Sequence, residues 1–152
     1  MNLGLLVEQG KLIDIQNLYA QNPNVFIPNY HLDYHLETAC SNGHLEVAQW
    51  LLSIKPSNNS YYNYGYIFLR ACENCHLQVA QWLFSIKPDI NISAKNEEAF
   101  RYACENGYLE VAQWLWSIKP SINIFADDEY VFLYARANGH LEVAQWLQTI
   151  LP

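Results

Sequence analysis

The stretch RYACENGYLEVAQWLWSIKP, residues 101–120, decides the fold, because close copies of it begin at residues 37, 69 and 133 of this 152-residue chain. These four copies follow one another at a period of 32 residues. A weaker copy, LVEQGKLIDIQNLYAQNP, occupies residues 6–23. Self-similarity at a fixed period is the signature of repeat arrays, whose terminal units are atypical because one side faces water. We therefore predict a single array over 1–152, with a degenerate N-terminal unit (1–33), full units (34–65, 66–97 and 98–129) and a truncated C-terminal unit (130–152).

Each unit predicts two helices joined by a tight turn. The first helix is expected to begin at Leu36 and its equivalents, and Asn-Gly pairs such as Asn42-Gly43 end it, since glycine adopts positive φ at little cost. The second helix is expected to begin at His44, with apolar residues recurring on one face. Lys-Pro then ends it, because a residue before proline is pushed out of the helical region. About ten residues remain as extended or hairpin-like connections. The equivalents of Leu36 are Phe68, Phe100 and Phe132.

This pattern resembles the ankyrin repeat, whose period is about 33 residues. Ala103, Gly107, Val111 and Leu115 stand at consensus positions, whereas the family's T-P-L-H start is replaced by tetrapeptides such as 34–37, YHLE. The resemblance implies an all-α helix-turn-helix solenoid that binds a protein partner on its concave face. The sequence ACENGYLEVAQWL, residues 103–115, is similar to the repeat sequences of arrays that giant viruses of amoebae encode.

Composition and charge restrict the partners. Fifteen acidic against eight basic side chains give a net charge of -7, which opposes binding to nucleic acid because phosphates are recognised by Lys and Arg. The N-terminus, MNLGLLVEQGK, does not resemble a secretory signal, and no apolar run approaches the roughly 18 residues of a membrane helix. We expect a cytoplasmic protein, in the host cytoplasm if it is viral, without a membrane partner and with its four cysteines as thiols.

Cys72, Cys75 and His76 match the C-x-x-C-H pattern of c-type haem attachment. Cys72 recurs as Cys40 and Cys104 in other units, and His76 likewise recurs, so the repeat alone accounts for both. Cys75 replaces the turn glycine, which predicts a strained substitution rather than a cofactor site. A zinc motif would need a second pair of ligands. We therefore expect no cofactor, and a haem or metal module remains the alternative.

Tryptophan also recurs once in each unit from the second onward. The rings are expected to pack between neighbouring second helices, because aromatic side chains contribute large buried areas. The alternative is an exposed row that forms a second binding surface. The residues concerned are Trp50, Trp82, Trp114 and Trp146.

No catalytic motif is recognisable. His31, Asp33 and His35 lie close together, and carboxylates gather at residues 127–129, but no nucleophile, phosphate-binding loop or metal spacing accompanies them. We expect a binding protein rather than an enzyme.

The predicted binding residues are those that vary between units while the second helix is copied. One position of the first helix holds Thr38, Arg70, Tyr102 or Tyr134, and Tyr and Arg often anchor interfaces. We expect a monomer whose partner contacts these positions and the loop tips. End-to-end pairing through Trp146, Leu147, Ile150 and Leu151 is the alternative. The full set of predicted contacts is Glu37, Thr38, Tyr62, Tyr64, Arg70, Glu73, Arg101, Tyr102, Glu105, Asp127, Asp128 and Tyr134.

Overall fold

The computed structural model describes residues 2–23, 29–54, 63–124 and 130–150. These ranges contain helices and no strand, so the predicted all-α class is confirmed. The helices are α1 (Leu3–Glu8), α2 (Leu12–Gln21), α3 (Asn29–Ser41), α4 (Leu45–Ser53), α5 (Tyr64–Glu73), α6 (Leu77–Ile86), α7 (Ala94–Glu105), α8 (Leu109–Ile118), α9 (Tyr130–Ala137) and α10 (Leu141–Ile150). None of these helices is long and apolar enough to cross a bilayer.

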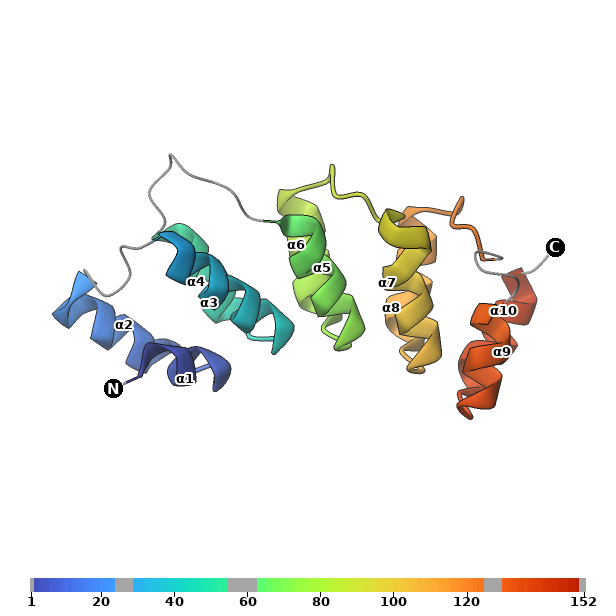
Figure 1. The fold of residues 1–152 in the computed structure, drawn as a ribbon, viewed down its shortest axis with the longest axis horizontal. Coiled ribbons are helices and arrows are strands. Elements are labelled where there is room, and N and C mark those ends of the chain that lie inside the picture. The colour runs from blue at the N-terminus through green and yellow to red at the C-terminus, as the bar shows by residue number, and fades with distance from the viewer. Residues whose placement is uncertain (1, 24–28, 55–62, 125–129, 151–152) are drawn as a thin grey trace.

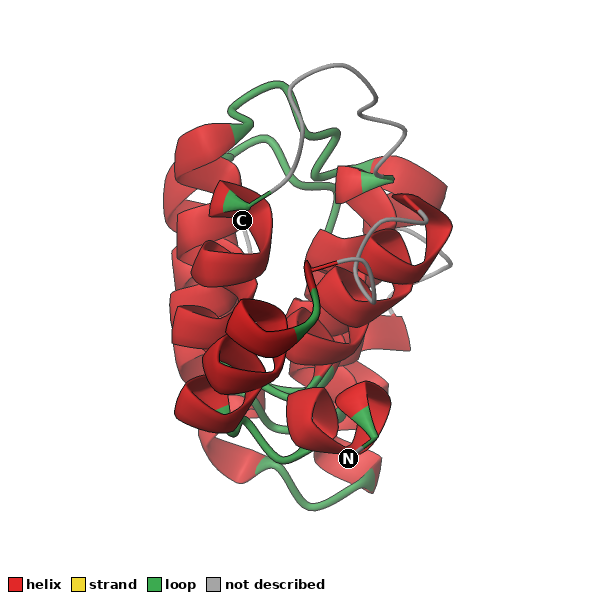
Figure 2. Ribbon diagram, turned by 90° about the vertical axis from the view of Figure 1, so that its left-hand side faces the viewer, coloured by secondary structure: helices red, strands yellow, loops and turns green. Residues whose placement is uncertain are grey.

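The helices form pairs that stand side by side in one row, with the two chain ends at opposite ends of the row (Figure 1). Each odd-numbered helix packs on the even-numbered helix that follows it. The main contacts between neighbouring pairs join α1, α3, α5, α7 and α9 in series. Figure 2 shows the longer connections at one end of the helices and the tight turns at the other. We call the outward surface of α1, α3, α5, α7 and α9 the first-helix face.

The residues that repeat along the sequence are the residues that the stack buries. Within one unit, Ala71, Cys72, Ala80 and Leu83 have no exposed surface, and Val79 is 1% exposed. Burying a leucine side chain stabilises a fold by about 1.5 to 3 kcal/mol, so a copied set of this kind stabilises every unit in the same way. The alanines let the helices of a pair approach closely.

The tight turns end the first helices as predicted. Gly43, Gly107 and Gly139 have φ values of 77°, 79° and 80°. After α3, the amide of His44 donates to the Ala39 carbonyl (2.9 Å) and that of Gly43 to the Cys40 carbonyl (3.2 Å), which is the Schellman arrangement.

Three histidines each connect a turn to the turn before it. His44 Nε2 lies 2.8 Å from the carbonyl oxygen of Glu8. Its ring fills the space where a Cβ on Gly10 would lie, only 2.6 Å from Nδ1. His76 covers Gly43 and His140 covers Gly107 in the same manner, with corresponding distances of 2.5 and 2.4 Å. The turn glycines therefore serve the packing between units as well as the turn itself.

The predicted starts of the first helices at Leu36, Phe68, Phe100 and Phe132 are wrong. Helices α3, α5, α7 and α9 begin two to seven residues earlier. At α5, the Asn63 side chain caps the helix by accepting a hydrogen bond from the Tyr66 amide (3.0 Å). No proline occurs from Tyr64 to Ile67, so nothing in this segment stops the helix from extending back to the cap.

The connections after α6 and α8 are held down by isoleucines. Their described parts consist of turns, in which Ile90 donates to the Lys87 carbonyl (3.2 Å) and Ile122 to the Lys119 carbonyl (3.1 Å). Ile92 is 8% exposed and Ile122 is 4% exposed, so these segments extend the core toward one end of the helices. Both second helices end at isoleucine with the predicted lysine as the C-cap.

Candidate functional site

The variable position of the first helices lies on the first-helix face in each unit from the second to the last. Thr38 lies on α3, Arg70 on α5, Tyr102 on α7 and Tyr134 on α9. All four retain solvent access, and Tyr134 is 44% exposed, while the next residue of each helix is a buried alanine, which a buried cysteine follows on α3, α5 and α7. The same helical geometry therefore presents Thr, Arg or Tyr at successive steps of the row.

Asparagine side chains fix the backbone that carries these residues. Asn42 donates to the Thr38 carbonyl, Asn74 to the Arg70 carbonyl and Asn106 to the Tyr102 carbonyl, each at 2.8 Å. In the last unit, Asn138 instead donates to the Glu105 carbonyl of the preceding unit at 3.0 Å. The Thr38, Arg70 and Tyr102 carbonyls also accept from the backbone amide of the same asparagine, so each side chain adds a second hydrogen bond at the end of a first helix.

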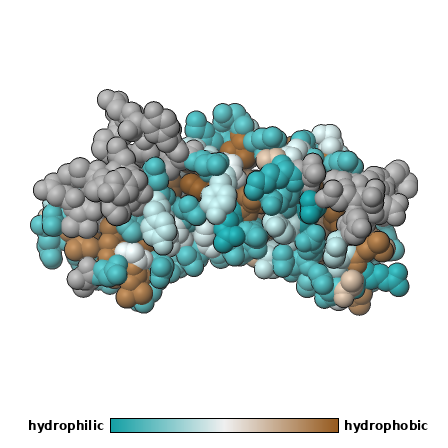
Figure 3. All heavy atoms as spheres, viewed as in Figure 1, coloured by the Kyte–Doolittle hydropathy of each residue, from teal (hydrophilic) through white to brown (hydrophobic). Residues whose placement is uncertain are grey.

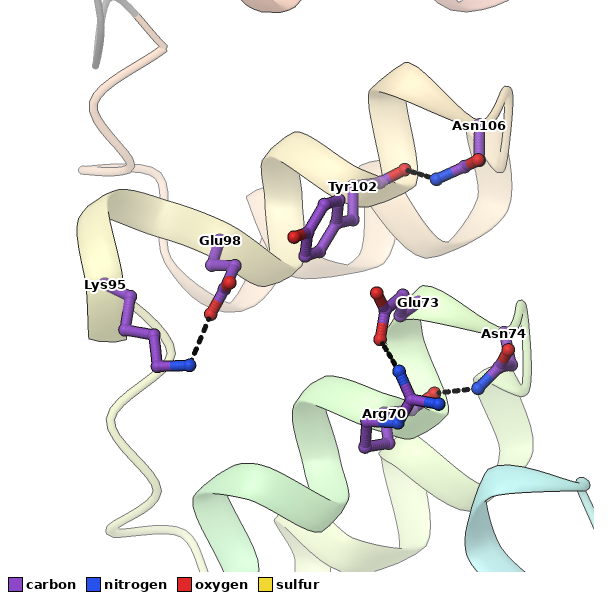
Figure 4. Close-up of polar contacts among 7 residues, drawn as sticks. All are labelled: Arg70, Glu73, Asn74, Lys95, Glu98, Tyr102 and Asn106. Carbon is purple, nitrogen blue, oxygen red and sulfur yellow. Dashed lines mark hydrogen bonds and ion pairs between the residues drawn. The ribbon is translucent and has the colours of Figure 1, made fainter.

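Arg70 and Glu73 form an ion pair one turn apart on α5, with side chains 37% and 26% exposed. Figure 4 shows this pair on α5 and Tyr102 on the neighbouring helix α7, with no interaction drawn between them. Lys95 and Glu98 form a second ion pair near the start of α7, with 3.2 Å between Nζ and Oε2. The central part of the face thus carries two pairs whose charges cancel.

The other predicted contact residues fall into three groups. Glu37, Arg101 and Glu105 are partly exposed on α3 and α7. Tyr64 lies at the start of α5, packed against the core with Lys87 Nζ 5.6 Å from its ring centroid, and burial raises its pKa. Tyr62, Asp127 and Asp128 lie outside the described residues.

Sequence reasoning missed four residues on the same face. Leu5 and Glu8 of α1, Tyr34 of α3 and Tyr66 of α5 line one hollow together with Glu37, Thr38 and Arg70. The signal was present, because Leu5 precedes Thr38 by the same 33 residues that separate Gly10 from Gly43, and Tyr34 and Tyr66 occupy one repeat position. The space-filling view shows a largely hydrophilic face, with hydrophobic atoms gathered toward its two ends (Figure 3).

A family model for ankyrin repeats (3 copies) matches residues 35–128 and 68–149. The chain belongs to the ankyrin repeat family. Ankyrin repeats are generally protein–protein interaction modules and are typically not enzymes. No curated protein matches the sequence significantly, so no homologue supports the resemblance to giant-virus arrays.

The cysteines of this ankyrin array lie in two different environments. Cys40, Cys72 and Cys104 have no exposed surface, whereas Cys75 is exposed. Burial raises the pKa of Cys40 to about 12 and raises the pKa of the other two buried thiols further. Cys75 adopts φ 64°, which confirms that it replaces a turn glycine. The two thiols of the C-x-x-C-H motif are therefore not presented on one surface. In the described part of the chain, no three His, Cys, Asp or Glu side chains are grouped to hold a metal ion.

The tryptophans of the ankyrin units pack between neighbouring units. Trp50 meets Tyr19 of α2 edge-on with 5.5 Å between ring centroids. Trp114 lies 6.1 Å from Phe84 and Trp146 lies 6.2 Å from Phe100 by the same measure. These three rings and Trp82 are half-buried against the core, as the packing interpretation predicts. Their partners are not second helices alone, because Phe100 lies on the first helix α7.

Proposed function

We propose that this ankyrin array is an adaptor that holds a protein partner on its first-helix face. The observation that carries the proposal is the contrast between two sets of positions on the same helices. Alanine and cysteine recur where the stack buries them, while Thr38, Arg70, Tyr102 and Tyr134 differ where solvent reaches them. Packing constrains the residues at the buried positions, whereas the residues at the exposed positions can vary to suit a partner.

Rigidity gives such a surface its affinity. Three capping asparagines fix the ends of the first helices within their own units, whereas His44 and Asn138 join successive units by hydrogen bonds. A preorganised array loses less conformational entropy when a partner binds than a flexible segment would lose. Tyr102, Arg70 and Tyr134 supply the residue types that most often dominate interface energetics. As part of the same proposal, the array acts in a cytoplasm, that of the host if the protein is viral.

A pull-down from an amoeba lysate tests the proposal. The bait is compared with Arg70→Ala/Tyr102→Ala/Tyr134→Ala, which alters the first-helix face in three units. The control is Gln49→Ala/Gln81→Ala/Gln113→Ala, which alters exposed residues of three second helices. Circular dichroism first establishes that both variants are folded. A partner retained by the control and lost from the first variant supports the proposal, whereas the opposite pattern assigns the binding surface to the second helices.

End-to-end self-association is the second candidate. Leu147 and Ile150 pack into or against the core, and Leu151 lies outside the described residues, so the apolar end differs from the one predicted. Leu133 and Leu141 in the last unit are instead 52% and 59% exposed, and Ile13 in the first unit is 72% exposed. Light scattering over a range of concentrations distinguishes the candidates. Pairing requires that the measured mass rises with concentration, and Leu141→Ser should abolish this rise.

A further inference from the structure

The N-terminal half of the first-helix face contains a hollow of about 650 Å³ between α1, α3 and α5. It is bordered by three large exposed side chains, which are Leu5 (50% exposed), Tyr34 (56%) and Tyr66 (41%). A second hollow of about 600 Å³ shares Leu5, Glu8 and Tyr34 with it, so the surface continues along α1. Exposed apolar groups that gather in this way usually mark an interaction site. We call the two together the acidic hollow.

The charge of the acidic hollow is negative. Glu8 and Glu37 contribute carboxylates to its lining, and neither makes an ion pair with a described residue. Arg70 is the only cationic residue among the described lining residues of the two hollows, and it is already paired with Glu73. The hollow therefore offers two uncompensated carboxylates beside tyrosine rings.

These features fit one class of occupant. Lysine and arginine side chains pair with carboxylates and also bind over tyrosine faces, while an adjacent apolar side chain can contact Leu5. A second copy of this chain is a poor occupant, because it carries the same net charge of -7. A polyanion is repelled for the same reason.

We propose that the acidic hollow docks a basic peptide segment of the partner, with Lys or Arg next to an apolar residue. Glu8 and Glu37 receive the cationic groups, and Leu5, Tyr34 and Tyr66 contact the apolar side chain and the stems of the basic ones. The inference rests on the proposed adaptor function and names the chemistry of its partner.

The probe is a displayed library of random peptides, each about twelve residues long, selected on the immobilised protein. Enriched peptides are then synthesised with a fluorescent label, and their affinities are measured by anisotropy. The test variant is Glu8→Gln/Glu37→Gln. The control is Glu110→Gln/Glu142→Gln, which makes the same change of net charge at exposed first-turn positions of α8 and α10.

We expect the enriched peptides to contain Lys or Arg next to an apolar residue. Their affinity should fall on the order of tenfold in the test variant and by no more than about threefold in the control, since two contact charges are lost in the first and only distant ones in the second. Equal losses would show nonspecific attraction to the net charge and would overturn the inference. Absence of enrichment, or enrichment of uncharged peptides, would also overturn it.

A third variant separates this inference from the function on which it rests. Arg101→Ala/Tyr102→Ala/Tyr134→Ala alters the opposite half of the first-helix face and leaves the acidic hollow intact. Peptides that lose affinity for this variant and keep it for Glu8→Gln/Glu37→Gln would overturn basic-peptide docking in the hollow while supporting the adaptor function. Peptides affected by neither variant would count against both.

Discussion

Replacing the turn glycine Gly43 with alanine tests whether the stacked turns hold the array together. Gly43 has φ 77°, and an added Cβ would lie 2.5 Å from Nδ1 of His76 in the next unit. Gly139 is the matched control, because it has φ 80° and an added Cβ there meets nothing within 4 Å. The two substitutions therefore share the backbone cost and differ in the contact with the following unit.

The expected magnitudes follow from those two contributions. Positive φ costs a non-glycine residue about 1 kcal/mol, so Gly139→Ala should lower the free energy of unfolding by about that amount. At Gly43, overpacking against the ring adds about 1 to 3 kcal/mol, because a hydrogen bond to the Ser41 backbone holds His76 in place. Gly43→Ala should therefore cost about 2 to 4 kcal/mol in total.

Urea unfolding followed by far-UV circular dichroism measures both changes, with slopes compared to verify that the transition remains cooperative. The double variant Gly43→Ala/His76→Ala completes a cycle that isolates the interaction between the two positions. If the ring causes the extra cost, the effect of Gly43→Ala should fall toward that of Gly139→Ala once the ring is absent. Equal costs at Gly43 and Gly139, with no coupling in the cycle, would refute the stacked-turn argument.

Three further outcomes are expected. Iodoacetamide should label only Cys75 in the folded protein and all four cysteines in denaturant, because Cys40, Cys72 and Cys104 are buried; mass spectrometry counts the adducts. Burial lowers the pKa of His76 below its ordinary value of 6.5, and His44 lowers it as well. The stability that neutral His76 contributes is therefore present above about pH 6.5 and is lost as the pH falls. Urea titrations between about pH 7.5 and 5 should show a shallower loss of unfolding free energy in His76→Gln than in the unmodified protein. Leu83→Ala, at a residue with no exposed surface, should cost about 2 to 5 kcal/mol, whereas Leu133→Ala, at a residue 52% exposed, should stay within about 0.5 kcal/mol in the same assay.

The second helices and the core could be predicted from the sequence because identical packing in each unit demands identical residues. Val47, Ala48 and Leu51 recur at fixed spacing and are buried in α4, which begins at Leu45, one residue after the predicted start at His44. The period also predicted the positive φ of Cys75, since the backbone of a repeat is conserved within the chain even where glycine is absent.

The starts of the first helices and the acidic hollow were not predicted, for a common physical reason. Both depend on residues outside the copied core, where no packing constraint forces a recurring pattern. Asn63 caps α5, but the corresponding residue of the next unit is Lys95, which lies inside α7. The hollow requires α1 to stand beside α3, and this contact is set by a degenerate unit offset by 33 residues instead of 32.

The packing of turn on turn also explains why two departures from the repeat occur together, Cys75 in place of the turn glycine and Tyr108 in place of histidine. Histidine follows the turn glycine of its own unit and covers the turn glycine of the unit before, as His44 covers Gly10 and His140 covers Gly107. In the same register, the residue that follows the Cys75 turn by 33 positions is Tyr108, where three other units have histidine. A Cβ at the turn occupies the space that the imidazole ring otherwise fills, so a histidine held against that turn would clash with it. The substitution that resembles half of a haem motif is thus accompanied by the loss of histidine at the position that covers the corresponding turns of other units.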